Sequence, residues 1–211
     1  MIPSHEEMTA ALAQRHGESL QRVFSSAKVA ICGLGGLGSN IAVSLARAGI
    51  GKLILIDFDR VDITNLHRQQ YKANQIGMFK CEALAQNLSE IAPYVQTEPH
   101  CVRLTEENCF DLLCDADIIC EAFDKAENKS MLVNYALEHF PDKYLVAASG
   151  MAGIGSPNEI VTRRVSKRFY LCGDGKSDVN ECGSLFSARV MLCAAHQAHT
   201  VLRILAKEFE D

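Results

Sequence analysis

The sequence predicts an α/β fold, in which a doubly wound, mostly parallel sheet is followed by a short antiparallel extension and a C-terminal helix. Short apolar runs alternate with helical patterns between residues 28 and 149. This alternation is typical of parallel strands that helices cover on both faces. After Gly150 the segments EIVTRRV and RFYLC alternate more like antiparallel strands. A long amphipathic pattern from about Ser187 to Lys207 predicts the closing helix.

The individual elements follow one another in a regular order. We expect a first helix over residues 4–24, because Ser4 is a suitable N-cap with Glu7 three residues later. The expected strands of the core are 28–32, 52–57, 95–100, 117–122 and 144–149, and its expected helices are 38–48, 79–91, 108–113 and 127–139. A chain of 211 residues has room for one full core, so we expect a single domain. Its expected parts are an N-terminal helical segment (1–27), a nucleotide-binding core (28–155) and an extension with the last helix (156–211).

Composition excludes several classes of protein. With 48% hydrophobic and 22% charged residues, the chain is typical of soluble globular proteins. A net charge of -5 without basic runs argues against nucleic acid as the main partner. No apolar segment reaches the roughly 20 residues that span a bilayer, so we expect no membrane insertion. The nine cysteines are odd in number and follow a polar N-terminus, which favours reduced thiols in a cytoplasmic protein.

The stretch ICGLGGLGSN predicts a nucleotide-binding loop between the first core strand and the next helix. Gly33, Gly35 and Gly38 have the spacing that allows a tight turn, approach of a phosphate and helix packing, and Gly36 is an additional glycine. The helix that follows offers free N–H groups to a phosphate. Asp57 ends the next strand, where an acid commonly binds ribose hydroxyls. The alternatives are a purely structural turn and a strand-end cap.

Two basic residues that follow Asp57 in the sequence bear on which reaction the nucleotide site supports. A reaction that expels pyrophosphate needs positive charge at the phosphates, because negative charge builds up on the leaving group. Arg68 in NLHRQ can make forked contacts to phosphate oxygens, and Lys80 in GMFK can act as a point charge. The alternative, which charge alone favours, is that both are solvated surface residues.

Taken together, four motifs resemble a known family. GLGGLGSN, LIDFDRVDITNLHRQ, GMFK and EAFDKAENK resemble the ThiF/ubiquitin-activating-enzyme-like adenylyltransferases, in order and with near-family spacing over residues 28–155. The short chain looks most like a bacterial ThiF of thiamine biosynthesis. The resemblance implies these roles: backbone from Gly33 to Gly38 at the phosphates, Asp57 at the ribose, Asn65 and Arg68 in the phosphate region, Lys80 at the phosphates, and Asp124 as the magnesium ligand. It also implies an arginine from the N-terminal helix of a partner subunit, for which Arg15 and Arg22 are candidates.

The implied reaction joins the C-terminal Gly-Gly carboxylate of a small ubiquitin-like sulfur carrier to the α-phosphate of ATP. The products are an acyl-adenylate and pyrophosphate, the implied cofactors are ATP and Mg²⁺, and the implied assembly is a homodimer. A chain-end carboxylate has a pKa of about 3.5, so it is already ionised at neutral pH and needs no general base. Two other interpretations stay open: an NAD-binding oxidoreductase or redox sensor, and a non-catalytic module that docks a carrier.

The chain departs from its longer relatives at several positions. Lys125 stands where the family usually has asparagine after the magnesium ligand. No CxxC pair occurs, so we expect no structural zinc. Cys172 and Cys182 bracket a loop rich in glycine and acidic residues, and each is either a reactive thiol or an idle one. Cys32 and Cys120 are expected to be packed core residues.

Overall fold

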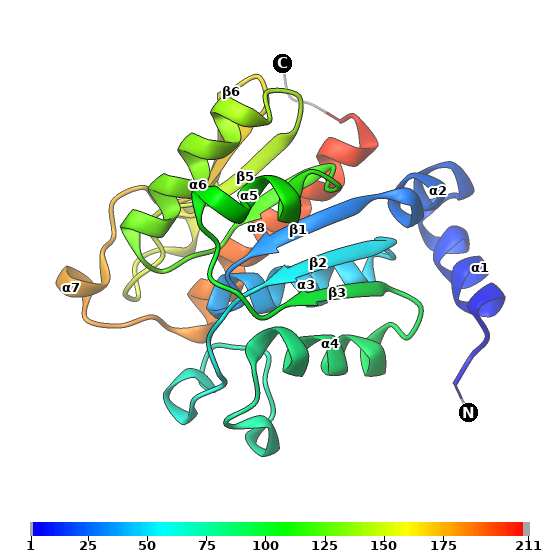
Figure 1. Cartoon of the computed structure of the whole chain (residues 1–211), viewed down its shortest axis with the longest axis horizontal. Helices are drawn as coiled ribbons and strands as arrows, with labels where there is room; N and C mark the ends of the chain where they lie inside the picture. Colours follow the sequence, from blue (N-terminus) through cyan, green and yellow to red (C-terminus); the bar gives the residue numbers. More distant parts are fainter. Residues whose placement is uncertain (1, 209–211) are drawn as a thin grey trace.

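The structure, a computed structural model, describes residues 2–208 and contains a seven-stranded sheet with helices on both faces (Figure 1). The strands are β1 (Lys28–Cys32), β2 (Lys52–Ile56), β3 (Gln96–His100), β4 (Ile118–Glu121), β5 (Tyr144–Ala148), β6 (Val161–Ser166) and β7 (Phe169–Gly173). Their order in the sheet is β3-β2-β1-β4-β5-β7-β6. All neighbouring pairs are parallel except β6 with β7. This confirms the predicted fold class.

The helices agree with the predicted order, with two differences: the first expected helix is divided, and a short helix over Val179–Cys182 was not predicted. They are α1 (His5–His16), α2 (Glu18–Ser26), α3 (Gly36–Arg47), α4 (Lys80–Ile91), α5 (Glu106–Leu113), α6 (Ala126–His139), α7 (Val179–Cys182) and α8 (Ser187–Ala206). The single helix expected over residues 4–24 is in fact two, because Gly17 takes a φ of 86° that ends α1. The predicted cap is present: Ser4 and Glu7 form a capping box at the start of α1.

The central strands β1, β2, β4 and β5 are buried on both faces, as expected for parallel strands. Along β1, Val29 and Ile31 face one hydrophobic core, and Ala30 and Cys32 face the other. The first core also holds residues of α3, α4 and α8, whereas the second holds residues of α5 and α6. The parallel strands point the same way, so the loops that leave their carboxyl ends lie along one edge of the molecule (Figure 1).

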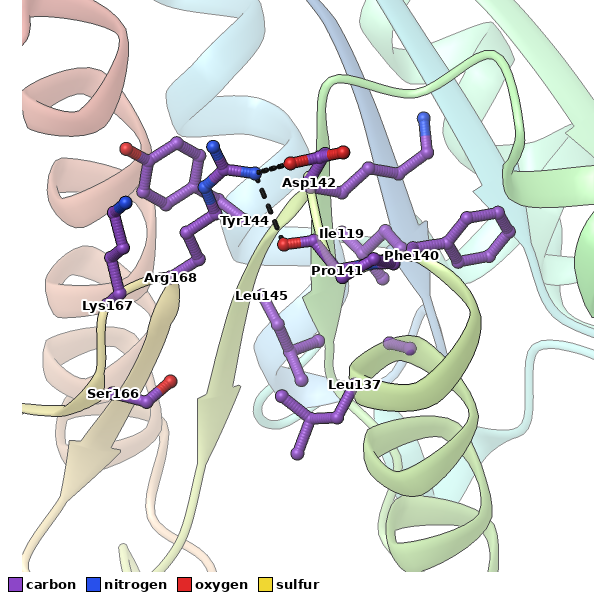
Figure 2. A pocket seen from close by; sticks show the side chains of 12 residues that line it. Ile119, Leu137, Phe140, Pro141, Asp142, Tyr144, Leu145, Ser166, Lys167 and Arg168 are labelled. Carbon is purple, nitrogen blue, oxygen red and sulfur yellow. Dashed lines mark hydrogen bonds and ion pairs between the residues drawn. The ribbon is translucent and has the colours of Figure 1, made fainter.

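The opposite edge, where the strands begin, holds a pocket of about 260 Å³ (Figure 2). It lies between the C-terminal end of α6, the start of β5 and the turn that joins β6 to β7. Arg168 closes one side, donating hydrogen bonds to the Asp142 carboxylate at 2.7 Å and to the Pro141 carbonyl at 3.2 Å. These residues precede β5 or lie in the β6–β7 turn, so this pocket is separate from the glycine loop, which follows the carboxyl end of β1.

Candidate functional site

The glycine loop connects β1 to α3 and is held by close backbone contacts. Gly33 takes a φ of 92°, and a Cβ there would lie 2.8 Å from the Ala122 carbonyl oxygen. A Cβ on Gly38 would lie only 1.8 Å from the Gly33 carbonyl oxygen. The first N–H groups of α3 have no acceptor within the helix, and they carry the positive end of its dipole. The loop thus has the tight turn and close helix packing that its sequence predicts, and phosphate binding by its N–H groups stays a prediction.

Asp57 follows β2 and fastens the loop to it. One carboxylate oxygen accepts the Leu34 N–H at 2.6 Å, and the other accepts the Asp59 N–H at 2.8 Å. Burial raises the pKa of Asp57, while the charge of Lys80 and these two N–H groups oppose the rise. Each carboxylate oxygen keeps a further lone pair that can accept a hydroxyl proton. Asp57 therefore holds the end of β2 against the loop, and its binding of a ribose stays a prediction.

Lys80 begins α4 and lies beside the same strand end. Its Nζ is 3.0 Å from a carboxylate oxygen of Asp59, and its backbone N–H donates to the Asp59 carbonyl at 2.9 Å. Only 7% of its side chain is exposed, so Lys80 is not the solvated surface residue of the alternative interpretation. The sequence analysis missed Asp59, although the DFD pattern that places it two residues after Asp57 was a visible signal.

Arg68 comes from the loop after β2 and reaches the start of α3. Its side-chain carbons lie 3.5 Å and 3.6 Å from where a Cβ of Gly36 would be. Partial burial lowers the pKa of its guanidinium group, and the negative charge of Asp124 opposes this. Asn65 lies one turn earlier, where its carbonyl accepts the backbone N–H groups of Arg68 and Gln69, each at 3.2 Å. The loop, Arg68 and Asp124 are thus neighbours although they are distant in sequence.

Asp124 lies in the turn between β4 and α6, with its side chain exposed. The N-cap of α6 is Lys125, and no side chain makes a capping hydrogen bond there. The sequence alone would also allow Asp124 to cap the helix that follows it, but it does not do so. Lys125 is also exposed, next to Asp124.

Arg15 lies far from these residues within one chain. It is exposed on α1, and the neighbouring Leu12 side chain lies 2.9 Å from where a Cβ of Gly49 would be. Gly49 follows the C-terminal end of α3, whereas the glycine loop precedes its start. The 12 residues of α3 span about 18 Å. Arg15 is therefore separated from the glycine loop of its own chain by the length of α3, and its role in the site of a second copy stays a prediction.

The two loop cysteines differ in their surroundings. Cys172 is fully buried in β7, and burial raises the pKa of its thiol. It is thus an unreactive core residue and not a second candidate for chemistry. Cys182 is exposed at the end of α7 and lines a pocket of about 480 Å³. Cys32 and Cys120 are buried, which confirms their predicted place in the core.

We expect thiol labelling to separate these cysteines. Treating the folded protein with iodoacetamide near pH 8 should alkylate Cys182 and Cys114, which are both exposed, and leave Cys172 unmodified. Peptide mass spectrometry over time measures each rate. Alkylation of Cys172 as fast as that of Cys182 would contradict the burial of the β7 thiol, and labelling in denaturant is the control that all three thiols can react.

A second group of charged residues, which the sequence analysis did not identify, lies just after the carboxyl end of β7. Asp174 accepts hydrogen bonds from the Lys176 and Ser177 N–H groups and, at 2.7 Å, from the guanidinium group of Arg189. Burial acts to raise the pKa of Asp174, but these hydrogen bonds hold it below its ordinary value. The group fixes the start of the loop that carries Cys182. Its only signal in the sequence was the acidic residue between Gly173 and Gly175.

Comparison with models of protein families identifies the family of this chain. The family model described as "ThiF family" matches residues 8–211. The chain belongs to the ThiF family. Adenylyltransferase and sulfurtransferase UBA4 of Lodderomyces elongisporus is 28% identical over 191 residues, which cover 88% of this chain and 42% of that protein. UBA4 of Candida glabrata is 37% identical over 130 residues, covering 61% and 30% of the two chains. The chain thus spans less than half the length of these relatives.

Solved structures share the fold of this ThiF-family chain. The E. coli tRNA N6-threonylcarbamoyladenosine dehydratase TcdA, solved in complex with ATP, superposes with a TM-score of 0.86 at 21% identity, covering 99% of this chain and 98% of that one. E. coli MccB, also solved with ATP, gives a TM-score of 0.73 at 21% identity and covers 99% and 67%. At this identity, the likeness establishes the common fold.

Two further properties concern metals and membranes. Within residues 2–208, no three or more His, Cys, Asp or Glu side chains are grouped so that they could hold a metal ion. In the same range, no helix combines the length and apolar character that crossing a bilayer requires.

Proposed function

We propose that this chain is an ATP-dependent adenylyltransferase that activates the C-terminal Gly-Gly carboxylate of a small ubiquitin-like sulfur carrier. The observation that carries the proposal is the meeting of the glycine loop, Asp57, Lys80, Arg68 and Asp124 at the carboxyl edge of the sheet. Membership of the ThiF family supports it, as do relatives named as adenylyltransferases and a structure of the same fold with ATP.

In this proposal the nucleotide spans the ends of β1 and β2. The ribose hydroxyls donate to Asp57, whose carboxylate is held by Leu34 and Asp59. The phosphates lie over the glycine loop and α3, with Arg68 on the α3 side and Lys80 on the β2 side. Asn65 lies one turn from Arg68 and is proposed to act in the same region. Lys80 would exchange or share its contact with Asp59 when the phosphates arrive, which keeps its charge at the site in either state.

The chemistry assigned to these residues is positioning and charge stabilisation. An oxygen of the carrier's terminal carboxylate attacks the α-phosphorus, the bond from that phosphorus to the bridging oxygen breaks, and pyrophosphate leaves with the electron pair. The carboxylate is already ionised, so no residue needs to remove a proton from it. Arg68 and Lys80 neutralise the charge that develops on the leaving group.

Asp124 fits the role of a magnesium ligand. Mg²⁺ binds oxygen, often through one or two carboxylates together with substrate phosphates, and Asp124 offers one exposed carboxylate beside the cation that is assigned to those phosphates. When bound, the ion would supply Lewis-acid stabilisation of phosphate charge.

The same proposal includes a homodimer, in which Arg15 of each subunit reaches the other's phosphates, and sulfur delivery to the thiamine thiazole in the cytoplasm. The position of Arg15, remote from the glycine loop of its own chain, supports the dimer. The proposed role in thiamine biosynthesis and the proposed cytoplasmic location rest on the resemblance of the motifs to a short ThiF.

ATP–pyrophosphate exchange tests the proposal. Purified protein with Mg²⁺ is assayed against a panel of small carriers that end in Gly-Gly, which includes ThiS-like carriers. A truncated carrier that lacks the Gly-Gly end is the negative control. We expect exchange that depends on one carrier and disappears in Asp124→Ala. ATP binding without exchange for any carrier would favour a docking module. Tight NADH binding without ATP binding would favour an oxidoreductase or redox sensor.

A further inference from the structure

A buried ion pair lies directly behind the turn that carries Asp124. Glu121 is the last residue of β4, and its side chain is completely buried. Lys129, the fourth residue of α6, places its Nζ 2.8 Å and 2.7 Å from the two carboxylate oxygens of Glu121. The pair therefore links the residue before the turn to the helix after it.

Further hydrogen bonds tie this pair to three elements. The Phe123 N–H, inside the turn, donates to Glu121 Oε1 at 2.8 Å. Lys129 Nζ also donates to the Ala148 carbonyl at the end of β5, at 2.9 Å. From α8, Gln197 Nε2 donates to the Glu121 carbonyl at 2.9 Å. The turn is thus anchored from β5, α6 and α8 together.

The same turn touches the glycine loop. A Cβ at Gly33 would lie 2.8 Å from the Ala122 carbonyl oxygen and 3.0 Å from the Phe123 ring. The backbone of residues 122–123 therefore packs against the loop with no room to spare. A shift of this turn would move Asp124 relative to the phosphate-binding groups.

We propose that Lys129 and Glu121 are positioning residues that hold Asp124 in register with the glycine loop. A buried ion pair adds little net stability compared with apolar residues of similar size, because both charges lose their hydration. Its contribution here is geometric: it fixes a short turn whose own side chain, Asp124, makes no capping bond to the helix. Neighbours that orient a metal ligand typically change metal affinity or activity by about 10- to 100-fold when they are replaced. The role in metal binding rests on the proposed function.

The first test measures the turn itself and needs no nucleotide. Hydrogen–deuterium exchange is compared between the wild type, Lys129→Met and Lys129→Arg. We expect faster exchange in the peptide containing Phe123 and Asp124 in Lys129→Met, and recovery in Lys129→Arg, which keeps the charge. Lys28→Met is the matched control: Lys28 pairs with Asp115 at 2.7 Å at the opposite edge of the sheet, so this variant should leave the turn unchanged.

The second test measures metal dependence. In Lys129→Met, we expect the Mg²⁺ concentration for half-maximal ATP–pyrophosphate exchange to rise by about tenfold or more. The KM for ATP at saturating Mg²⁺ should change far less, since the ribose and phosphate contacts remain. A purely structural role would lower the amount of folded protein without moving the Mg²⁺ midpoint. If Lys129→Met does not fold, Glu121→Gln/Lys129→Met removes both charges, leaves none unpaired, and is expected to show the same shift.

The two tests distinguish the inference from the proposed function. Two results in a folded Lys129→Met protein would overturn the inference while the adenylyltransferase activity stands. One is an unchanged rate of hydrogen–deuterium exchange at Phe123, and the other is an unchanged Mg²⁺ midpoint of ATP–pyrophosphate exchange. A wild type that neither binds ATP nor exchanges pyrophosphate would overturn the proposed function, and the hydrogen-exchange result would still decide whether the pair holds the turn.

Discussion

Replacing Arg68 with alanine is expected to slow ATP–pyrophosphate exchange by about 10²- to 10³-fold, the loss typical of removing one aligned donor to developing charge. The side chain lies against the start of α3, and the negative charge of Asp124 acts on its guanidinium group, so Arg68 borders the place where the phosphates are proposed to bind. Because its side chain is only partly buried, removing it should change the free energy of unfolding by less than about 1 kcal/mol.

Steady-state exchange measurements over a range of ATP concentrations check this prediction. Arg68→Lys should recover only part of the rate, since lysine keeps the charge but loses the forked pair of donors. Arg47→Ala is a suitable control, because Arg47 is exposed in the last turn of α3, away from the loop. A rate for Arg68→Ala within about twofold of the control would mean that Arg68 does not contact the phosphates.

Gly38→Ala is expected to have the largest effect on stability. The added Cβ would lie 1.8 Å from the Gly33 carbonyl oxygen, and both partners of this clash belong to rigid backbone. Overpacking in a well-packed region costs about 1–3 kcal/mol, and a clash with backbone lies at the upper end. Urea unfolding measures the loss, and nucleotide binding should disappear with it because the loop must open.

Gly35→Ala provides the matched control in the same loop. Its Cβ would meet only the amide nitrogen of Gln69, at 3.7 Å, which is an ordinary contact. We expect its unfolding free energy to stay within about 1 kcal/mol of the wild type, while nucleotide affinity falls because a methyl group enters the phosphate-binding surface. Equal destabilisation by the two variants would contradict the close approach of Gly38 to Gly33.

Much of the fold could be read from local patterns. Alternating apolar runs and helical segments predicted the parallel strands, because a strand buried on both faces is apolar throughout and a covering helix is amphipathic. The glycine spacing together with Asp57 predicted the nucleotide loop, since a tight turn and a strand-end acid are local requirements. The break at Gly17 was missed because the residues on each side continue to favour helix.

The positions of the site residues could not be predicted from local sequence patterns alone. Arg68 and Lys80 could equally have been solvent-exposed by sequence alone, and the burial of Lys80 beside Asp59 depends on how α4 packs at the end of β2. Cys172 and Cys182 were indistinguishable in sequence, yet one lies inside β7 and the other on an exposed helix.

The sequence by itself determined the order of the elements, the glycine loop and the membership of a nucleotide-binding class, because these depend on residues close together in the chain. Only the tertiary structure decided that Glu121 and Lys129 lock the Asp124 turn to β5, and that Arg15 lies at the other end of α3 from the loop of its own chain. Such relations depend on which strands become neighbours in the sheet and which loops leave the same edge, and no periodicity within a single segment encodes them.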